Sequence, residues 1–136
     1  MNKEGDKLTE KELSKYYWLR KEITDLENRL KEFGIGLSAT NFDKEISGIS
    51  TTDSIQEKRA IIVEKWINAR ITALEEYLKI ENYIESVEDS EIRQIMRYRF
   101  LDLYDWYKIG ELMHCDRTTA SKKMRSYIKD SHISHI

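Results

Sequence analysis

Apolar side chains recur every three or four residues along the first quarter of the chain. Between about Thr9 and Phe33 they follow one stripe that is close to a heptad and has one polar member: Leu13, Tyr16, Arg20, Ile23, Leu26 (or Glu27), Leu30 and Phe33. This spacing predicts a single amphipathic helix. Thr9 and Glu12 form a capping-box pattern at its start, and Gly34 suits its C-terminal end.

A second periodic segment runs from about Ser54 to Ser86 and carries two neighbouring apolar stripes. A face this wide predicts a long helix that contacts more than one partner. Residues 35–53 lie between the two helices, are rich in Gly, Ser and Thr and lack periodicity, so we expect a connector there, ordered or not. The two helices should form an antiparallel hairpin. The stripes are Ile62, Trp66, Ala69, Ala73 and Ile80, and Val63, Ile67, Leu74, Tyr77 and Ile84.

Three shorter helices are predicted after Glu88: Glu91 to about Leu101, Trp106 to Met113, and Arg117 to about Lys129. Asp89 or Ser90 and Asp116 are suitable N-caps. We therefore expect an all-α fold, with a helical hairpin over residues 1–87 and a three-helix module over residues 88–136. The side chains expected on the inner faces of the module are Ile92, Ile95, Met96, Phe100, Trp106, Ile109, Leu112, Met113, Ala120, Met124, Tyr127 and Ile128.

The last two predicted helices have the spacing of a helix-turn-helix. Three residues, His114 to Asp116, turn the chain, with Cys115 expected as a small core residue. The first core position of the next helix is the small Ala120, which lets two helices cross closely. The second helix of such a motif presents its outer face to the major groove of DNA. Here the predicted DNA-binding residues, whose polar groups suit base edges and phosphates, are Arg117, Thr118, Ser121, Lys122 and Arg125.

The charge distribution favours the same part of the chain. The whole sequence has a formal net charge of -2. From Arg93 to Lys129, however, there are nine Lys and Arg residues against four acids, and Arg117 to Lys129 contains no acid. A polyanionic partner is therefore expected for the C-terminal module.

The run DWYKIGELMHCDRTTASKKM, from Asp105 to Met124, resembles the region 4 helix-turn-helix of bacterial sigma factors. It is also similar to the module of small phage-encoded regulators, the RinA- and ArpU-like late activators. Ile109-Gly110 matches the Ile/Val-Gly position of the first motif helix, and Asp116-Arg117 falls where the recognition helix begins with Thr/Ser-Arg. The resemblance implies a DNA-binding transcription regulator of phage or mobile-element type. It lacks a counterpart of the sigma region that binds the -10 element, so a complete sigma factor is not expected.

Two other functions fit the same features. A phage packaging protein, similar to a small terminase subunit, also joins a helix-turn-helix to oligomerisation helices. A protein-interaction module that binds RNA polymerase or a sigma factor is the other alternative. We expect a homo-oligomer in which the hairpin mediates dimerisation or contact with RNA polymerase. The target DNA sequence, the sign of regulation and the number of subunits stay open.

Several classes of protein are disfavoured. Cys115 and the scattered His114, His132 and His135 lack the spacing of zinc ligands, so no metal site is expected. Motifs for nucleophilic, metal or phosphate-loop chemistry are missing, so neither an enzyme nor a cofactor is expected. A single cysteine, no signal-like N-terminus and no long apolar run predict a cytoplasmic protein without a membrane span.

Overall fold

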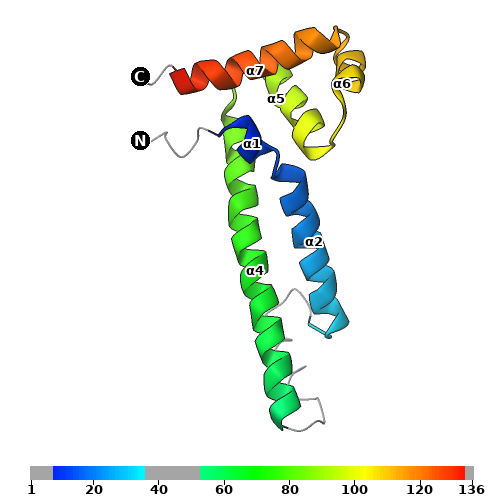
Figure 1. Cartoon of the computed structure of the whole chain (residues 1–136), viewed down its shortest axis with the longest axis vertical. Coiled ribbons are helices and arrows are strands. Elements are labelled where there is room, and N and C mark those ends of the chain that lie inside the picture. Colours follow the sequence, from blue (N-terminus) through cyan, green and yellow to red (C-terminus); the bar gives the residue numbers. More distant parts are fainter. Residues whose placement is uncertain (1–7, 36–52, 134–136) are drawn as a thin grey trace. The chain divides into compact units, whose positions relative to one another are not determined.

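The computed structural model describes residues 8–35 and 53–133, and all regular structure among them is helical (Figure 1). The all-α prediction is confirmed. Most of the expected connector, residues 36–52, lies outside the described residues. The elements are α1 (Glu10–Leu13), α2 (Tyr16–Glu32), α4 (Asp53–Ser86), α5 (Ser90–Met96), the π-helical turn η3 (Arg97–Leu101), α6 (Trp106–Met113) and α7 (Arg117–Ile133).

The chain divides into two compact units. Residues 20–75 form one, called here the hairpin unit. Residues before 20 and after 75 form the other, called here the terminal unit. The terminal unit therefore contains α1 and the last turns of α4 together with the C-terminal helices, and residues 87 and 88 both lie within it.

In the hairpin unit, α2 and α4 lie antiparallel and side by side (Figure 1). Leu30 and Val63 are buried between them, and the Phe33 ring meets the Trp66 ring edge-on with centroids 5.0 Å apart. The predicted C-cap at Gly34 is confirmed: its φ is 79°, and the next N–H donates back to the Leu30 carbonyl at 2.9 Å. A positive φ at glycine with this 6→1 hydrogen bond is a Schellman motif.

The first predicted helix begins as expected but is not continuous. The Glu12 N–H donates to the Thr9 hydroxyl, and the Thr9 N–H donates to the Glu12 carboxylate, which completes the capping box and lowers the pKa of Glu12. The helix then breaks at Ser14 and Lys15, so the predicted single helix is wrong there. The Ser14 hydroxyl donates to the Glu10 carbonyl at 2.9 Å, a back-bond that bends helices.

The apolar stripe of α2 differs from the prediction at one position. Leu19 is buried and Arg20 is exposed, because the guanidinium stays in water while the 3–4 spacing continues from Tyr16 through Leu19. On α4, Ile62 was expected on a buried stripe but is exposed. Apart from Tyr83, the buried residues of α1, α2 and α4 nevertheless keep heptad-like spacing: Leu13, Tyr16, Leu19, Ile23, Leu26, Leu30, Val63, Ala73, Ile80 and Ile84.

The core of the terminal unit joins α1 and the end of α4 to α5, α6 and α7. The Tyr16 ring packs against the Tyr77 ring at 5.1 Å, and burial raises the pKa of Tyr16. Of the predicted inner residues, Leu112 is 40% exposed and was placed wrongly, because it lies on the side of α6 that turns away from α7. The buried members are Ile92, Ile95, Met96, Phe100, Ile109, Ala120, Met124 and Ile128.

The predicted helix up to Leu101 has the expected bounds but changes type. After Met96 it widens into the π-helical turn η3, in which the Asp102 N–H donates to the Arg97 carbonyl at 3.0 Å. Leu103 then adopts a left-handed φ of 57° and reverses the chain. Asp105 caps α6 by accepting the Lys108 N–H at 2.8 Å. These turns set where α6 begins.

Met124, which is fully buried in the terminal unit, provides a test of this core. Replacing it with alanine removes packed atoms and leaves a cavity, so Met124→Ala should lower the free energy of unfolding by about 2–5 kcal/mol. The exposed Lys129→Ala on the same helix should change it by less than about 0.5 kcal/mol. Urea denaturation followed by circular dichroism measures both. Equal stabilities would contradict the burial of Met124.

Candidate nucleic-acid interface

The crossing of α6 and α7 leaves no room for a side chain at Gly110. A Cβ atom there would lie 2.6 Å from the Cys115 carbonyl oxygen and 2.9 Å from the Arg117 backbone nitrogen. Ala120, the first core residue of α7, is buried on the same side. The two helices therefore pack with their backbones nearly in contact, which is the close crossing predicted for a helix-turn-helix.

Backbone hydrogen bonds build the turn between these helices. His114 has a left-handed φ of 58°, and the Cys115 N–H donates to the Gly110 carbonyl at 2.9 Å. Cys115 was predicted to be a core residue, which is wrong because its side chain is exposed. The carbonyl of Cys115, rather than its thiol, faces Gly110. A glycine opposite the turn leaves space for main chain only, so the side chain points to solvent.

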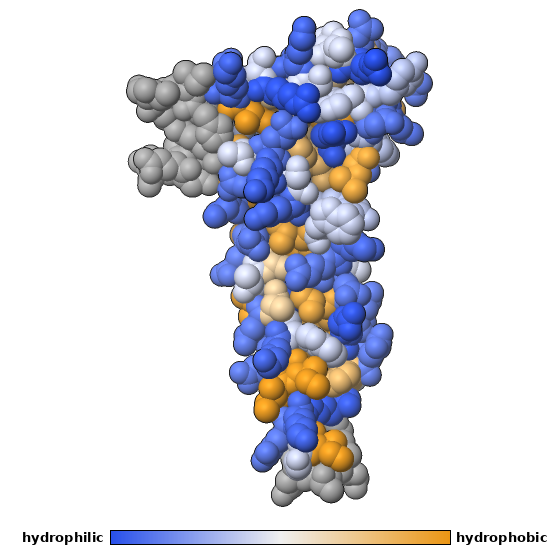
Figure 2. All heavy atoms as spheres, viewed as in Figure 1, coloured by the Kyte–Doolittle hydropathy of each residue, from blue (hydrophilic) through white to orange (hydrophobic). Residues whose placement is uncertain are grey.

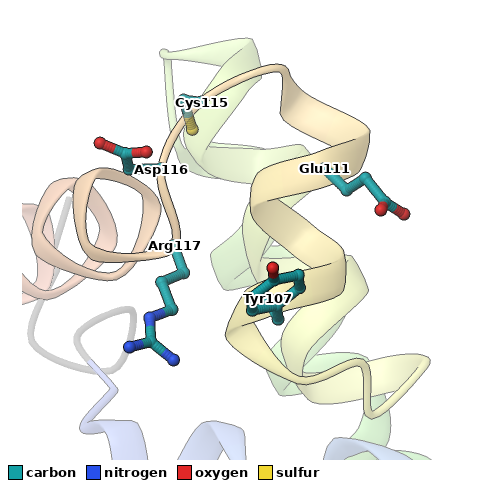
Figure 3. A pocket seen from close by; sticks show the side chains of 5 residues that line it. All are labelled: Tyr107, Glu111, Cys115, Asp116 and Arg117. Carbon is teal, nitrogen blue, oxygen red and sulfur yellow. The ribbon is translucent and has the colours of Figure 1, made fainter.

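An open pocket of about 390 Å³ lies where α7 begins. Figure 3 shows the Tyr107 and Arg117 side chains on the same side of the turn, while the carboxylates of Glu111 and Asp116 point away from each other. The unpaired N–H groups of the first turn of a helix carry partial positive charge. A guanidinium and a phenol beside such a helix end suit an oxygen-bearing anion. Tyr107, Glu111, Cys115, Asp116 and Arg117 line the pocket.

Four of the predicted DNA-binding residues lie in the first turns of α7. Arg117, Thr118 and Lys122 are exposed. Ser121 is half-buried, and its hydroxyl donates to the Thr118 carbonyl at 3.2 Å. Within the described part of the chain, neither Arg117 nor Lys122 forms an ion pair. Both charges are therefore available to a ligand.

The fifth predicted residue, Arg125, has a different environment. Its Nε and Nη2 atoms donate to the two carboxylate oxygens of Glu10 on α1, at 3.3 and 3.2 Å. Its guanidinium also lies 5.5 Å from the centre of the Trp106 ring, and the guanidinium of Arg99 lies 4.8 Å from the same ring. Arg125 therefore belongs to a cation–indole cluster that includes α1, whereas Arg117 and Lys122 do not.

Lys123, on another side of α7, is also engaged. Its ammonium group donates to the Glu91 carboxylate on α5, which raises the pKa of Lys123. The cations of α7 thus divide into two that pair with acids of neighbouring helices and others that face solvent. Glu91 on α5 and Glu10 on α1 thus neutralise two of the cations of α7.

Two residues of this surface were not singled out from the sequence. Tyr107, beside Arg117, is 70% exposed. Its place at the start of the first motif helix was a usable signal, because a large aromatic side chain next to the packed Trp106 must face outward. No pattern in the sequence could identify Glu10 as part of this surface, because its partner Arg125 lies 115 positions later.

Two other kinds of site have no counterpart in the described residues. No three His, Cys, Asp or Glu side chains there lie close enough together to hold a metal ion. No helix in that part of the chain is long and apolar enough to cross a membrane.

Comparisons with models of protein families, with curated proteins and with solved structures yield no significant match.

Gly110→Ala tests the close crossing directly. Alanine gains about 1 kcal/mol of helix propensity over glycine, yet its Cβ would overlap main-chain atoms that cannot move independently. We expect the clash to prevail and the free energy of unfolding to fall by about 1–3 kcal/mol. Glu111→Ala, an exposed neighbour on α6, should have little effect. A Gly110→Ala protein that melts at or above the wild-type temperature would show that α6 and α7 can move apart enough to accommodate a Cβ atom.

Proposed function

We propose that this chain binds double-stranded DNA through the N-terminal half of α7 and acts as a transcription regulator. The proposal is carried by two features found together at the α6–α7 crossing, a fixed helix direction and unneutralised positive charge. Backbone contact at Gly110 fixes the direction of α7. On the exposed side of its first turns, Arg117 and Lys122 carry charges that no acid in the described residues neutralises.

In this mode α7 is the recognition helix in the major groove. Arg117 lies in the first turn, where recognition helices approach base edges most closely. Thr118 and Lys122 follow on the exposed side, and their hydroxyl and ammonium groups suit bases or phosphates. The exposed phenol of Tyr107 is placed to donate to a backbone phosphate beside the pocket. One module of this size covers little DNA, so tight binding favours two copies.

The regulator assignment rests on the resemblance of residues 105–124 to the sigma region 4 and phage activator modules. The phage or mobile-element type is part of the same proposal. In it the hairpin unit supplies dimerisation or contact with RNA polymerase.

A protein-binding role for the hairpin has support of its own. Large apolar side chains are exposed along α4, and Figure 2 shows apolar residues at the surface among charged ones. Such side chains offer apolar surface to a protein partner. Those within the hairpin unit are Ile55, Ile61, Ile62 and Ile71.

The central test is fluorescence anisotropy of a labelled duplex taken from the neighbourhood of the protein's own gene, across a salt series. Wild type should bind with an affinity that falls steeply as salt rises, because phosphate contacts release counterions. Reversing charge at Arg117→Glu and Lys122→Glu together should weaken binding by at least about a hundredfold at low salt.

A matched control reverses charge away from this surface. Lys58→Glu together with Lys65→Glu changes the net charge equally and places both substitutions at exposed positions of the hairpin unit. It should bind nearly as well as wild type. Equal losses in both double variants would point to net charge alone. A folded wild type that fails to bind any duplex at low salt would overturn the proposed function and favour the protein-interaction alternative.

A further inference from the structure

Resting on the proposed function, we infer that Arg125 is a phosphate-contact residue that Glu10 keeps occupied, so that α1 limits the affinity of α7 for DNA. The evidence is the arrangement of the two side chains. Both oxygens of the Glu10 carboxylate accept hydrogen bonds from Arg125, one from Nε and one from Nη2. Arginine binds phosphate through the same pair of parallel donors. The carboxylate thus takes the place that a DNA phosphate would fill.

Arg125 is well placed for such a contact. Arg117, Ser121 and Arg125 are spaced by four along α7, so they form one row on the helix surface. The row starts at Arg117, which forms no ion pair among the described residues, and reaches Arg125 about two turns later. A DNA backbone that follows α7 past Arg117 would therefore meet the guanidinium of Arg125 if Glu10 did not hold it.

The ion pair is also easy to exchange. Its donor–acceptor distances, 3.3 and 3.2 Å, are longer than those of tight charge-assisted hydrogen bonds. The side chains are 51% and 38% exposed, so water and salt reach both. Leu8 and Leu13, which flank Glu10, are buried, and they hold α1 when the pair opens. A phosphate can therefore replace the carboxylate without displacing the helix.

The surroundings favour an anion at this point. The guanidinium groups of Arg99 and Arg125 both lie near the Trp106 ring, which gathers positive charge there. Arg99 is held by its hydrogen bond to the Tyr104 carbonyl at 3.2 Å, so its charge stays in place. Glu10 is the acid paired with this cluster among the described residues. If Glu10 loses its charge, the cluster is left with two cations and no counter-charge.

The experiment compares Glu10→Gln with wild type in the duplex anisotropy assay across a salt series. Glutamine keeps the size of the side chain and removes its charge. Freeing Arg125 adds one phosphate contact, so the plot of log affinity against log salt should steepen by about 0.9, with binding about three- to tenfold tighter near 0.1 M salt. Arg125→Ala in the Glu10→Gln background should cancel both gains, whereas Arg125→Ala alone should change little.

The matched control is Asp25→Asn in the hairpin unit. Asp25 is paired with Arg29, so this variant also removes one acid from an exposed ion pair. Tightening by Glu10→Gln but not by Asp25→Asn supports the inference.

Three results would overturn it. Equal effects of Glu10→Gln and Asp25→Asn would leave net charge as the cause. If the tighter binding of Glu10→Gln persists when Arg125→Ala is added, Arg125 is not the residue that makes the new contact. In both cases wild type still binds DNA, and the proposed function stands. Failure of every folded variant to bind duplex at low salt would overturn the proposed function itself, and the inference with it. Circular dichroism melting of each variant identifies the folded ones.

Discussion

The contact between main chain and main chain at Gly110 is the constraint on which the terminal unit depends. Because a Cβ there would lie 2.6 Å from the Cys115 carbonyl oxygen, α6 and the start of α7 are held closer than side chains normally allow. Glycine inside a helix costs about 0.5–1 kcal/mol relative to alanine. The fold tolerates that cost because the close crossing fixes both the turn and the direction of α7. The exposure of Arg117, Thr118 and Lys122 follows from that direction.

Ion pairs with neighbouring helices determine which cations of α7 remain unneutralised at its surface. Lys123 and Arg125 are bound by acids of α5 and α1, while Arg117 and Lys122 remain in solvent. Exposed pairs of this kind stabilise a fold by only about 0–1 kcal/mol each. Their main effect is therefore on the surface that α7 presents. Positive charge is concentrated in its first turns and is balanced farther along the helix.

The helices were predictable because their signals are local. Periodic apolar residues, the Thr9–Glu12 capping box and Gly34 all act within a few positions. The capping box and Gly34 lie where they were expected, as do the periodic apolar residues apart from Ile62 and Leu112. The misses have a different origin. The break at Ser14 depends on one hydroxyl that bonds backward, and the π-helical turn has no sequence signature. Cys115 was misplaced because main chain fills the space beside Gly110. In the candidate interface, the residues of the recognition helix were predicted from their spacing. The pairing of Arg125 with Glu10 could not be predicted, because no periodicity spans 115 positions.

The terminal unit is assembled from both ends of the chain, and this affects when it can form. Residues near Glu10 and Tyr16 pack with segments around Tyr77 and Arg125, so these contacts close long loops. Closing such loops slows folding relative to a bundle built from neighbours in sequence. During synthesis Glu10 and Tyr16 emerge long before Tyr77 and Arg125, with which they pack. The hairpin unit, whose residues are contiguous, can fold while the ribosome is still working. A nascent chain therefore completes the surface around α7 only after α7 itself has been released, and a chain truncated before α7 never completes it.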